Sequence, residues 1–386
     1  MMMSFSIGRT AAFVAALSLA LTPVSATEPY QPGAVIAALK KVNHRLKIVT
    51  SHRGAYTDWC PENTECAINR AAQNNIEAVE IDVKETKDGV LWPSHDITIG
   101  RGTNYTVNGQ LFDPFKRSAQ NSANNPYISS MTSTEMFKLK LRDMSGRVTH
   151  VPATQLFDLL LNTRNNHPNI LVILDIKYAS SVQKAALAIK ALHMQNQVIM
   201  KFSMDFFTPL EVTRHTLGYP FVPTLYSGSL DRIAETRHLN LRSYYDRVFS
   251  YVADYRTVPG LVYYELGNKM FYQEGSSVGV QGPMQNLTQR LRQVNAPIGN
   301  FNPVIEHHAT AQHPYTGFYH TDGQCCTRLI DFLTVTKHFG RETRDDRPNL
   351  EWQLKYNDNV ITDNAIDGRS LAHRLGFRQD EYTLVR

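Results

Sequence analysis

Short apolar runs alternate with longer amphipathic stretches along most of the chain. The short runs predict strands at residues 46–54, 76–86, 169–177, 197–203, 221–227 and 358–365. The longer stretches predict helices at residues 61–75, 153–166, 181–195, 229–240 and 368–377. The run at 169–177 has few polar positions, which is typical of a parallel strand buried on both faces. The alternation therefore favours a parallel sheet covered by helices.

The length of the chain and its repeated strand–helix units favour one large domain over two smaller ones. The chain has 386 residues, and residues 27–386 fit a single α/β domain, a (β/α)8 TIM barrel with inserted loops, better than two separate domains. Residues 97–150 are rich in Asn, Ser, Thr and Gly and are predicted to form an insertion near the functional site. Residues 243–327 hold many tyrosines and Gly/Pro-rich loops, and we expect strands 6 and 7 there with enlarged loops.

The first 26 residues have the pattern of a secretory signal. Arg9 precedes an apolar run at residues 11–21, and the small residues Val24-Ser25-Ala26 follow it. The apolar run is too short to span a bilayer comfortably, so we expect cleavage after Ala26, with a retained membrane anchor as the alternative. No later segment is long and apolar enough for a transmembrane helix. The mature protein is therefore expected to be secreted or periplasmic.

Charge and composition narrow the possible partners. The chain is 42% hydrophobic and 19% charged, which is ordinary globular composition, and its formal charge is +5. Loss of Arg9 with the signal lowers this charge to +4. Because no Lys/Arg block stands out, nucleic acid is not an expected partner. A weakly basic surface remains compatible with a small anionic substrate.

The four cysteines are Cys60, Cys66, Cys325 and Cys326. In an exported chain they indicate disulfides, and four cysteines allow three connectivities. A bridge between Cys60 and Cys66 is the favoured pairing, because a helical turn and a proline could bring them close. The pairing of Cys325 and Cys326 stays open. A zinc site built from the four lacks the usual paired C-x-x-C spacing.

Two carboxylates share one face of the strand predicted at 76–86. Glu80 and Asp82 are two residues apart, so their side chains point the same way. Val79, Ile81 and Val83 point the other way, into apolar packing. Two neighbouring carboxylates repel each other unless shared protons, basic partners or a hard cation compensate. Oxygen ligands suit Mg²⁺ or Ca²⁺, so this pair is a candidate metal site.

Further polar residues lie in or directly after the predicted strands. Asp175 stands inside the apolar run 169–177, where burial is costly unless the charge is paired or binds metal. His52 and His95 fall where strands pass into loops, which is the active end of a parallel barrel. Of two such histidines, one can act as the general base and the other as the general acid. The planar guanidinium group of Arg53 can donate two parallel hydrogen bonds to phosphate oxygens.

Each of these residues also has a purely structural interpretation. Glu80 and Asp82 could belong to an ion-pair network, and a histidine at a strand end is usually a satisfied polar residue. Asp175 could pair with Lys177, which lies on the same strand face, or with Arg53. Glu62 is interpreted as ordinary helix-start chemistry, since proline and an acidic residue both favour a first helical turn. The combination of two histidines, three carboxylates and a phosphate-binding cation nevertheless favours an active site.

The motifs that carry these residues resemble those of the glycerophosphodiester phosphodiesterase family. In order and spacing they match as HRG (52–54), PENT (61–64), EIDV (80–83), DG (88–89), HD (95–96) and GRGTN (100–104). The specific match covers residues 48–104. LDIK (174–177) and ITD (361–363) are similar to the later strands of the family.

The resemblance implies a (β/α)8 barrel that hydrolyses a phosphodiester to an alcohol and glycerol 3-phosphate with a divalent cation, Ca²⁺ or Mg²⁺. It implies that His52 and His95 are the acid/base pair. The implied metal ligands are Glu80, Asp82 and Asp175, and the implied phosphate contact is Arg53. We assign Lys177 to substrate binding as well.

The chain departs from the family pattern in three respects. It has Asp175 where the family usually has Glu, which shortens this ligand. Cysteines flanking the PENT motif, here Cys60 and Cys66, are not a general family feature. The regions 97–150 and 243–327 are enlarged, which leaves the head group of the substrate open.

Two alternative functions remain at this stage. One is a phospholipase D-like lipid phosphodiesterase similar to sphingomyelinase D, which usually carries an aromatic residue after Asp-Asn-Pro. Here Asp363-Asn364 is followed by Ala365 and Ile366, which counts against it. The other alternative is a non-catalytic secreted binding protein on the same barrel, which loss of a histidine or carboxylate would have supported.

Overall fold

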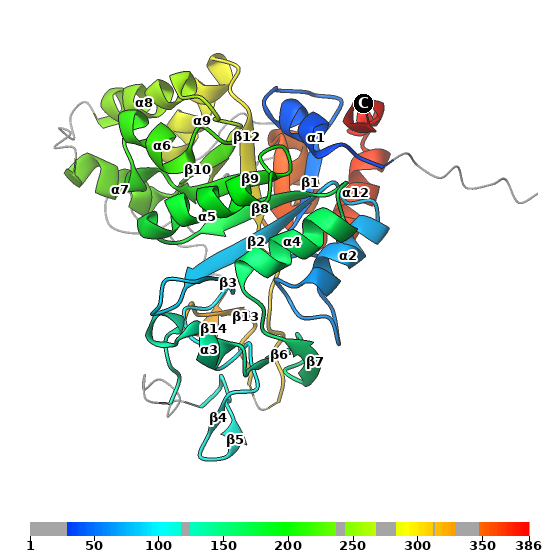
Figure 1. Cartoon of the computed structure of the whole chain (residues 1–386). Helices are drawn as coiled ribbons and strands as arrows, with labels where there is room; N and C mark the ends of the chain where they lie inside the picture. The colour runs from blue at the N-terminus through cyan, green and yellow to red at the C-terminus, as the bar shows by residue number, and fades with distance from the viewer. Residues whose placement is uncertain are drawn as a thin grey trace, which may run out of the picture.

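The computed structural model describes residues 29–116, 124–236, 244–267, 283–311, 313–328 and 347–385. Eight parallel strands of these residues form a closed barrel, as the sequence predicted (Figure 1). They are β1 (Ile48–Ser51), β2 (Ala78–Glu85), β8 (Leu171–Ile176), β9 (Val198–Ser203), β10 (Phe221–Leu225), β11 (Tyr264–Leu266), β12 (Ile298–Asn302) and β15 (Asn359–Thr362). The predicted signal at residues 1–26 lies outside the described residues.

The last strand in the sequence closes the ring. β15 lies between β12 and β1, and β1 pairs in turn with β2. The remaining neighbours follow chain order from β2 through β8 to β12. The short strand β3 (Leu91–Pro93) adds an antiparallel partner to the end of β2.

Helices join the strands and cover the outside of the barrel. Those near predicted positions are α2 (Glu65–Gln73), α4 (Leu156–Asn166), α5 (Ala179–Ala191), α7 (Ser227–Thr236) and α12 (Ala365–Arg374). Those the sequence did not predict are α1 (Pro32–Leu39), α6 (Pro209–Thr216), α8 (Tyr244–Asp254), α9 (Pro283–Gln293) and α11 (Leu350–Tyr356). The parallel strands inside and the helices outside thus form a (β/α)8 barrel.

Helix α2 begins later than the sequence suggested. Thr64 is its N-cap, because the Thr64 hydroxyl accepts a hydrogen bond from the Ala67 N–H at 3.3 Å. The residues before it form a turn. The interpretation of Glu62 as a helix-start residue is therefore wrong, and its side chain is available for other contacts.

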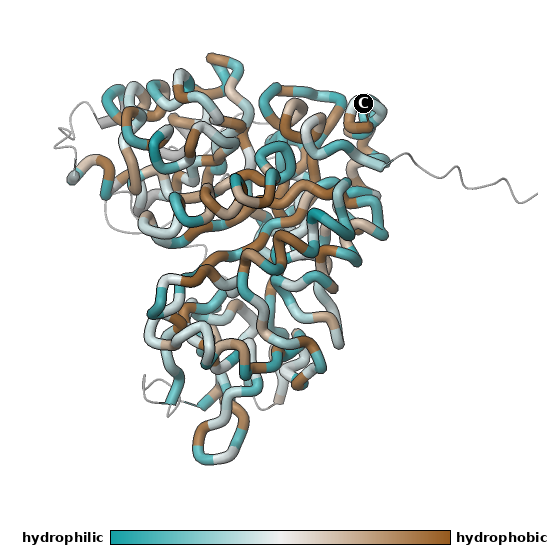
Figure 2. The backbone as a smooth tube through the Cα atoms, in the orientation of Figure 1, coloured by the Kyte–Doolittle hydropathy of each residue, from teal (hydrophilic) through white to brown (hydrophobic). Residues whose placement is uncertain are grey.

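Strand alternation sorts the barrel into two faces. Val79, Ile81 and Val83 of β2 belong to the large apolar cluster between the strands and the surrounding helices. The alternate residues of β2 face the barrel interior, where Ala78 belongs to a second apolar cluster. That cluster fills the end of the barrel where the strands begin, with Leu171, Ile173, Ile199 and Val222, and α1 packs beneath it. Hydrophobic segments accordingly concentrate in the barrel (Figure 2).

Two segments distant in the sequence form a small subdomain beside the barrel. The first supplies β4 (Thr106–Val107), β5 (Gln110–Leu111), α3 (Ser133–Met136), β6 (Lys140–Arg142) and β7 (Val148–Pro152). The second supplies the hairpin of β13 (Gly317–Tyr319) and β14 (Cys325–Arg328), which lies in the same group of elements in Figure 1. Backbone hydrogen bonds join the segments, from Ile97 N–H to Thr321 O at 2.8 Å and from Cys325 N–H to Pro114 O at 2.9 Å.

In the part of the chain that the structure describes, no helix combines the length and apolar character needed to cross a membrane.

A buried ion pair ties the C-terminal residues to the start of the barrel. Glu77, which is fully buried, accepts two hydrogen bonds from Arg378, the shorter at 2.5 Å. Glu77 also accepts the Val49 N–H of β1 at 2.9 Å. Arg378 contacts Glu381 as well, at 2.7 Å. Both charges are therefore satisfied only while this end of the barrel is closed.

We expect Arg378→Ala to lower the free energy of unfolding by about 3–5 kcal/mol, because it leaves the Glu77 carboxylate buried without a cation. Urea unfolding followed by circular dichroism measures this loss. The matched control is Arg45→Ala, which removes an exposed arginine paired with Asp380 at 3.1 Å and should cost less than about 1 kcal/mol. Equal losses in the two variants would contradict this account.

Candidate active site

Three carboxylates converge on the inner face of the barrel where the strands end. Glu80 and Asp82 of β2 are each 1% exposed. Asp175 of β8 is the register partner of Asp82, so its side chain lies beside theirs. The i, i+2 spacing on β2 and the pairing of β2 with β8 therefore bring together the three acidic residues that the sequence singled out.

Two lysines neutralise part of this charge. Lys201 of β9, which is 3% exposed, places its Nζ 3.1 Å from Glu80 Oε1 and 3.0 Å from Asp175 Oδ2. The same Nζ lies 3.3 Å from Oε1 of Glu265 on β11. Lys177 Nζ lies 2.5 Å from Asp175 Oδ2 and 3.5 Å from Asp82 Oδ1. Lys177 thus contacts carboxylates here, and the sequence reasoning missed both Lys201 and Glu265.

His52 follows β1 and is held by a carboxylate. Its Nδ1 lies 2.9 Å from Oδ1 of Asp363, which follows β15 and also accepts the Tyr56 hydroxyl at 3.0 Å. Burial lowers the pKa of His52, but the Asp363 carboxylate outweighs it, and the pKa is raised above its ordinary value. The other ring nitrogen, Nε2, lies 4.0 Å from Glu80 Oε2. His52 is only 8% exposed, more buried than a loop histidine would be.

His95 is oriented in a similar way from the loop after β3. Its Nδ1 lies 2.8 Å from Asp96 Oδ1. Asp96 also accepts hydrogen bonds from Arg101 Nε at 2.7 Å and Nη2 at 2.9 Å. Burial opposes ionisation of Asp96, yet Arg101 and His95 hold its pKa well below the usual range. Both candidate histidines thus have a carboxylate at Nδ1, which leaves Nε2 for chemistry.

Arg53 links the two histidines through a network of ion pairs. Its Nη1 lies 2.9 Å from Glu62 Oε2, and Glu62 Oε1 lies 3.0 Å from Nη2 of Arg101. Burial alone would raise the pKa of Glu62, but Arg53 and Arg101 outweigh it and lower the pKa to about 2. Arg53 Nε also lies 3.5 Å from Asp82 Oδ2. Arg53 is 3% exposed, so carboxylates surround the cation that the sequence assigned to phosphate.

The backbone at Arg53 has an unusual conformation that glycine makes possible. Arg53 has φ 57° and Gly54 has φ 77°, both in the left-handed region. A Cβ at residue 54 would come within 2.7 Å of the Ala67 Cβ on α2. The glycine of the HRG motif thus lets the loop turn tightly against α2.

Glu306 is a further site residue that the sequence did not reveal. It follows β12, and its Oε1 lies 2.7 Å from Arg53 Nη1. Its Oε2 accepts the backbone N–H of Tyr319 on β13 at 2.9 Å. The β13–β14 hairpin therefore positions the carboxylate that holds Arg53.

The PENT loop is tied to the barrel by an amide and by a disulfide. Asn63 Oδ1 accepts the Asp82 N–H at 2.9 Å, and the Asn63 N–H donates to Arg53 O at 2.9 Å. Cys60 and Cys66 form a disulfide across this loop, with an S–S distance of 2.05 Å and a Cα–Cα distance of 5.7 Å. The loop that contacts both Arg53 and Asp82 is thereby closed on itself.

One group of buried residues could hold a metal ion. His52, Glu80 and Asp82 each offer a ligand atom, and these atoms lie within 4.8 Å of one another. The chemistry of this donor set suits a hard cation, because two of its three members are carboxylates. Asp175 is not part of this group, and its Oδ2 contacts both lysines instead.

Acidic side chains outnumber basic ones around His52, Glu80 and Asp82. The surrounding carboxyl groups are Glu62, Glu80, Asp82, Asp96, Asp175, Glu265, Glu306 and Asp363, and the surrounding lysines and arginines are Arg53, Lys84, Arg101, Lys177 and Lys201. Burial raises the pKa of Glu80 to about 7, against the opposing charge of Lys201. Carboxyl groups thus outnumber lysine and arginine side chains in this network, which favours a divalent cation at His52, Glu80 and Asp82.

A cavity of about 1260 Å³ lies between the barrel and the small subdomain. It meets the ion-pair network at Glu62, Asp96, Arg101 and Glu306. Its remaining walls include the apolar side chains of Trp92, Phe112, Phe115, Leu141 and Met144. The cavity is not lined by His52, His95 or Glu80. It therefore lies next to these candidate catalytic residues and does not enclose them.

The closed barrel, with histidines and carboxylates gathered where its strands end, defines a (β/α)8 protein with an enzyme-like site. Residues 52–219 match the family described as "Glycerophosphoryl diester phosphodiesterase family". This match confirms the resemblance that the sequence motifs predicted.

Curated relatives match over part of the chain. Human glycerophosphodiester phosphodiesterase 1 is 39% identical over 85 residues, which are 22% of this chain and 25% of the relative. A glycerophosphodiester phosphodiesterase of Caldanaerobacter subterraneus is 44% identical over 57 residues, 15% of this chain and 23% of the relative. The aligned part thus spans about a quarter of each relative's length.

A solved structure supports the fold over nearly the whole chain. The glycerophosphoryl diester phosphodiesterase from Parabacteroides distasonis superimposes with a TM-score of 0.55 at 14% identity, covering 90% of this chain and 93% of the other. At this identity the likeness concerns the barrel fold alone.

We expect the Cys60–Cys66 pair to appear as one cross-linked peptide in a digest made without reductant. Replacing both residues by serine should lower the free energy of unfolding by about 2 kcal/mol, because the closed loop is short. Mass spectrometry of digests with and without reductant, and urea unfolding, measure the two effects. Alkylation of both thiols in the native, unreduced protein would refute the bridge.

Proposed function

We propose that the chain hydrolyses glycerophosphodiesters to an alcohol and glycerol 3-phosphate. The observation that supports this most directly is the connection of His52 and His95 through one ion-pair network beside a cluster of buried carboxylates. Two histidines so placed fit an acid and a base acting on opposite oxygens of a phosphodiester. The match of residues 52–219 to the family model and the names of the curated relatives support the same substrate class.

A divalent cation, Ca²⁺ or Mg²⁺, is part of this proposal. Glu80 and Asp82 would hold it, with Asp175 as the third carboxylate predicted from the sequence. When bound, the ion would offset charge on the phosphate and polarise the attacking group, a glycerol hydroxyl or water. The proximity of the His52, Glu80 and Asp82 ligand atoms and the excess of carboxyl groups over lysines and arginines around them support this assignment.

The histidines would move the protons of the reaction. Asp363 and Asp96 hold the Nδ1 atoms of His52 and His95, which favours the tautomer with Nε2 available. One Nε2 would accept the proton of the attacking glycerol hydroxyl or water, and the other would protonate the leaving alkoxide. The carboxylates thereby act as positioning residues for the two rings.

Arg53 would supply positive charge at the phosphate from a fixed position. Glu62 and Glu306 both contact the Nη1 of Arg53 and hold its guanidinium in place, so little side-chain entropy is lost when substrate binds. Lys177, which is 39% exposed at its side chain, is the cation with most access to solvent in this cluster and would contact the substrate as well. The neighbouring cavity would take the alcohol substituent of the phosphodiester.

We also propose that the protein acts after export. The predicted signal at residues 1–26 and the bridge across the PENT loop support an oxidising compartment.

We expect His52→Ala and His95→Ala each to lower kcat by about 100-fold or more, the scale of general acid–base groups. The matched control is His44→Ala, an exposed histidine before β1, which should keep wild-type turnover. Circular dichroism checks that the variants fold. Near-normal kcat in either site variant would remove that histidine from the mechanism.

The substrate and the metal are tested together with glycerophosphocholine and sphingomyelin, each with and without chelator. We expect turnover of glycerophosphocholine alone, its loss in chelator and its recovery with Ca²⁺ or Mg²⁺. Cleavage of sphingomyelin instead would support the lipid phosphodiesterase, and activity on neither substrate with no bound metal would support the binding protein.

Asp175→Asn separates the metal role of this residue from its pairing with lysine. If Asp175 is a metal ligand, Asp175→Asn should raise the metal concentration that gives half of the full activity. The matched control, Asp246→Asn, changes a carboxylate on α8 whose side chain is 74% exposed and should leave that concentration unchanged. An unchanged metal requirement in Asp175→Asn, with altered stability, would leave only the ion-pair role.

A further inference from the structure

The segment from Glu306 to Cys326 contains metal-binding residue types that the proposed reaction does not use. Its sequence, EHHATAQHPYTGFYHTDGQCC, carries four histidines and two adjacent cysteines. Glu306 serves the Arg53 network, but the histidines and cysteines have no part in it. Short tracts rich in cysteine and histidine often bind metal ions. Whether this segment can do so depends on how close its histidine and cysteine side chains lie in space.

The structure brings three of these side chains together. His307, Cys325 and Cys326 each offer a ligand atom, and these atoms lie within 4.8 Å of one another. His307 is held there by the backbone, since its N–H donates to Gly317 O at 3.0 Å. Cys325 is held by its own N–H, which donates to Pro114 O at 2.9 Å. The group therefore comes from two chain segments, each held in place by its own backbone hydrogen bond.

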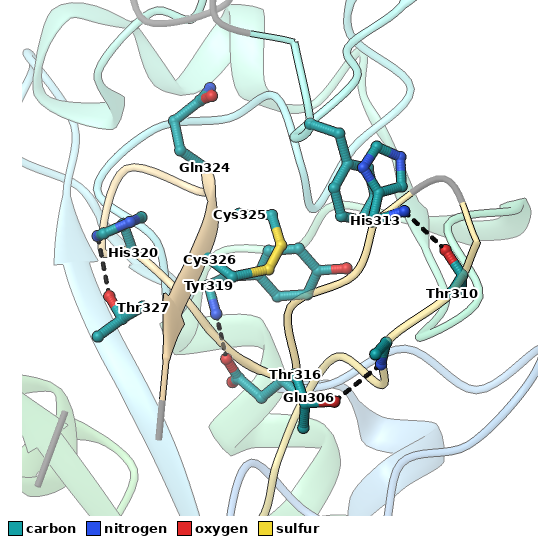
Figure 3. The surroundings of a disulfide bond; sticks show 12 residues. Glu306, Thr310, His313, Thr316, Tyr319, His320, Gln324, Cys325, Cys326 and Thr327 are labelled. Atoms are coloured by element: carbon teal, nitrogen blue, oxygen red, sulfur yellow. Dashed lines mark hydrogen bonds between the residues drawn. A yellow bond between two sulfur atoms is a disulfide. The ribbon is translucent and has the colours of Figure 1, made fainter. Parts of the chain in front are cut away.

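An irregularity in β14 explains how two adjacent cysteines can act together. In a regular strand, neighbouring side chains point to opposite faces. Here Tyr319 pairs with Cys325 and Phe318 pairs with Thr327, so Cys326 is an extra residue in the ladder. Both cysteine side chains consequently leave β14 on the same side, where they form a disulfide (Figure 3).

His307 presents a ring nitrogen that no other group satisfies within the part of the chain that the structure describes. Its Nε2 is buried and has no hydrogen-bond partner. The ring lies among aromatic side chains, 4.9 Å from the Phe115 ring and 6.4 Å from the Tyr319 ring between centroids. A buried polar atom without a partner is costly and calls for an explanation, and a bound cation would supply one.

The donor set selects a soft cation. Two thiolates and one imidazole suit Cu(I) or zinc, whereas the carboxylates of the barrel suit hard ions. With only three donors in the group, Cu(I) is the better match, because structural zinc sites are almost always four-coordinate. We propose that Cys325, Cys326 and His307 form a binding site for one Cu(I) ion when the two cysteines are reduced.

The redox step that opens this site requires an external dithiol as the reductant. A dithiol passes two electrons and two protons to the Cys325–Cys326 disulfide and becomes a disulfide itself. The two thiols that form then lose their protons as they bind the cation. Oxidation to the disulfide removes two of the three ligands, so the site exists in one redox state only.

Transfer of Cu(I) from its bathocuproine disulfonate complex tests the proposal. The full-length protein is reduced with a phosphine, desalted without oxygen and titrated into the complex, whose absorbance falls as copper leaves it. We expect one Cu(I) per chain for the reduced protein and none for the unreduced protein. Equal uptake by the two forms, or none by either, would overturn the proposal.

Matched variants locate the site. Cys325→Ser/Cys326→Ser should abolish the uptake, whereas Cys60→Ser/Cys66→Ser should preserve it. His307→Ala should weaken the affinity about tenfold or more, since a direct ligand should matter at least as much as a supporting residue. His308→Ala, at the exposed neighbouring histidine, should bind as the wild type does. Circular dichroism confirms folding of each variant, and equal weakening by His307→Ala and His308→Ala would refute the assigned ligand.

Discussion

Buried negative charge at the end of the barrel is the constraint on which the site depends. Glu80, Asp82 and Asp175 are held side by side by strand geometry, and isolated buried carboxylates are too costly to remain ionised. Lys201 and Lys177 offset part of this charge from inside the barrel, and Arg53 offsets part of it from the rim. These cations do not match every carboxylate around Glu80 and Asp82, and a divalent cation could offset the remaining negative charge.

Features set by local spacing were predictable from the sequence. The pairing of Glu80 with Asp82 on one face follows from their separation by two residues, and the buried strand around Asp175 follows from its apolar run. The positions of His52 and His95 at strand ends follow in the same way. The eight-stranded barrel was predictable because most of its strands are apolar and alternate with helices.

Features set by contacts between distant segments were not predictable. Glu306 reaches Arg53 across most of the chain, and no local pattern marks it. Lys201 and Glu265 meet only because β9 and β11 face the same interior. Glu62 was misread because proline and an acidic residue suit a helix start, whereas here they form the turn before α2. Strand β11 has three residues, too few for a periodic pattern.

The place of β15 between β12 and β1 has a consequence for how the chain reaches this structure. Until residue 362 is available, β1 and β12 present unpaired edges, and the ring cannot close. Contacts between segments so distant in sequence form late and slowly. Asp363, which follows β15 and orients His52, joins the site in the same event. Catalytic competence would therefore arise together with ring closure, and an open barrel would be both inactive and prone to edge-to-edge association.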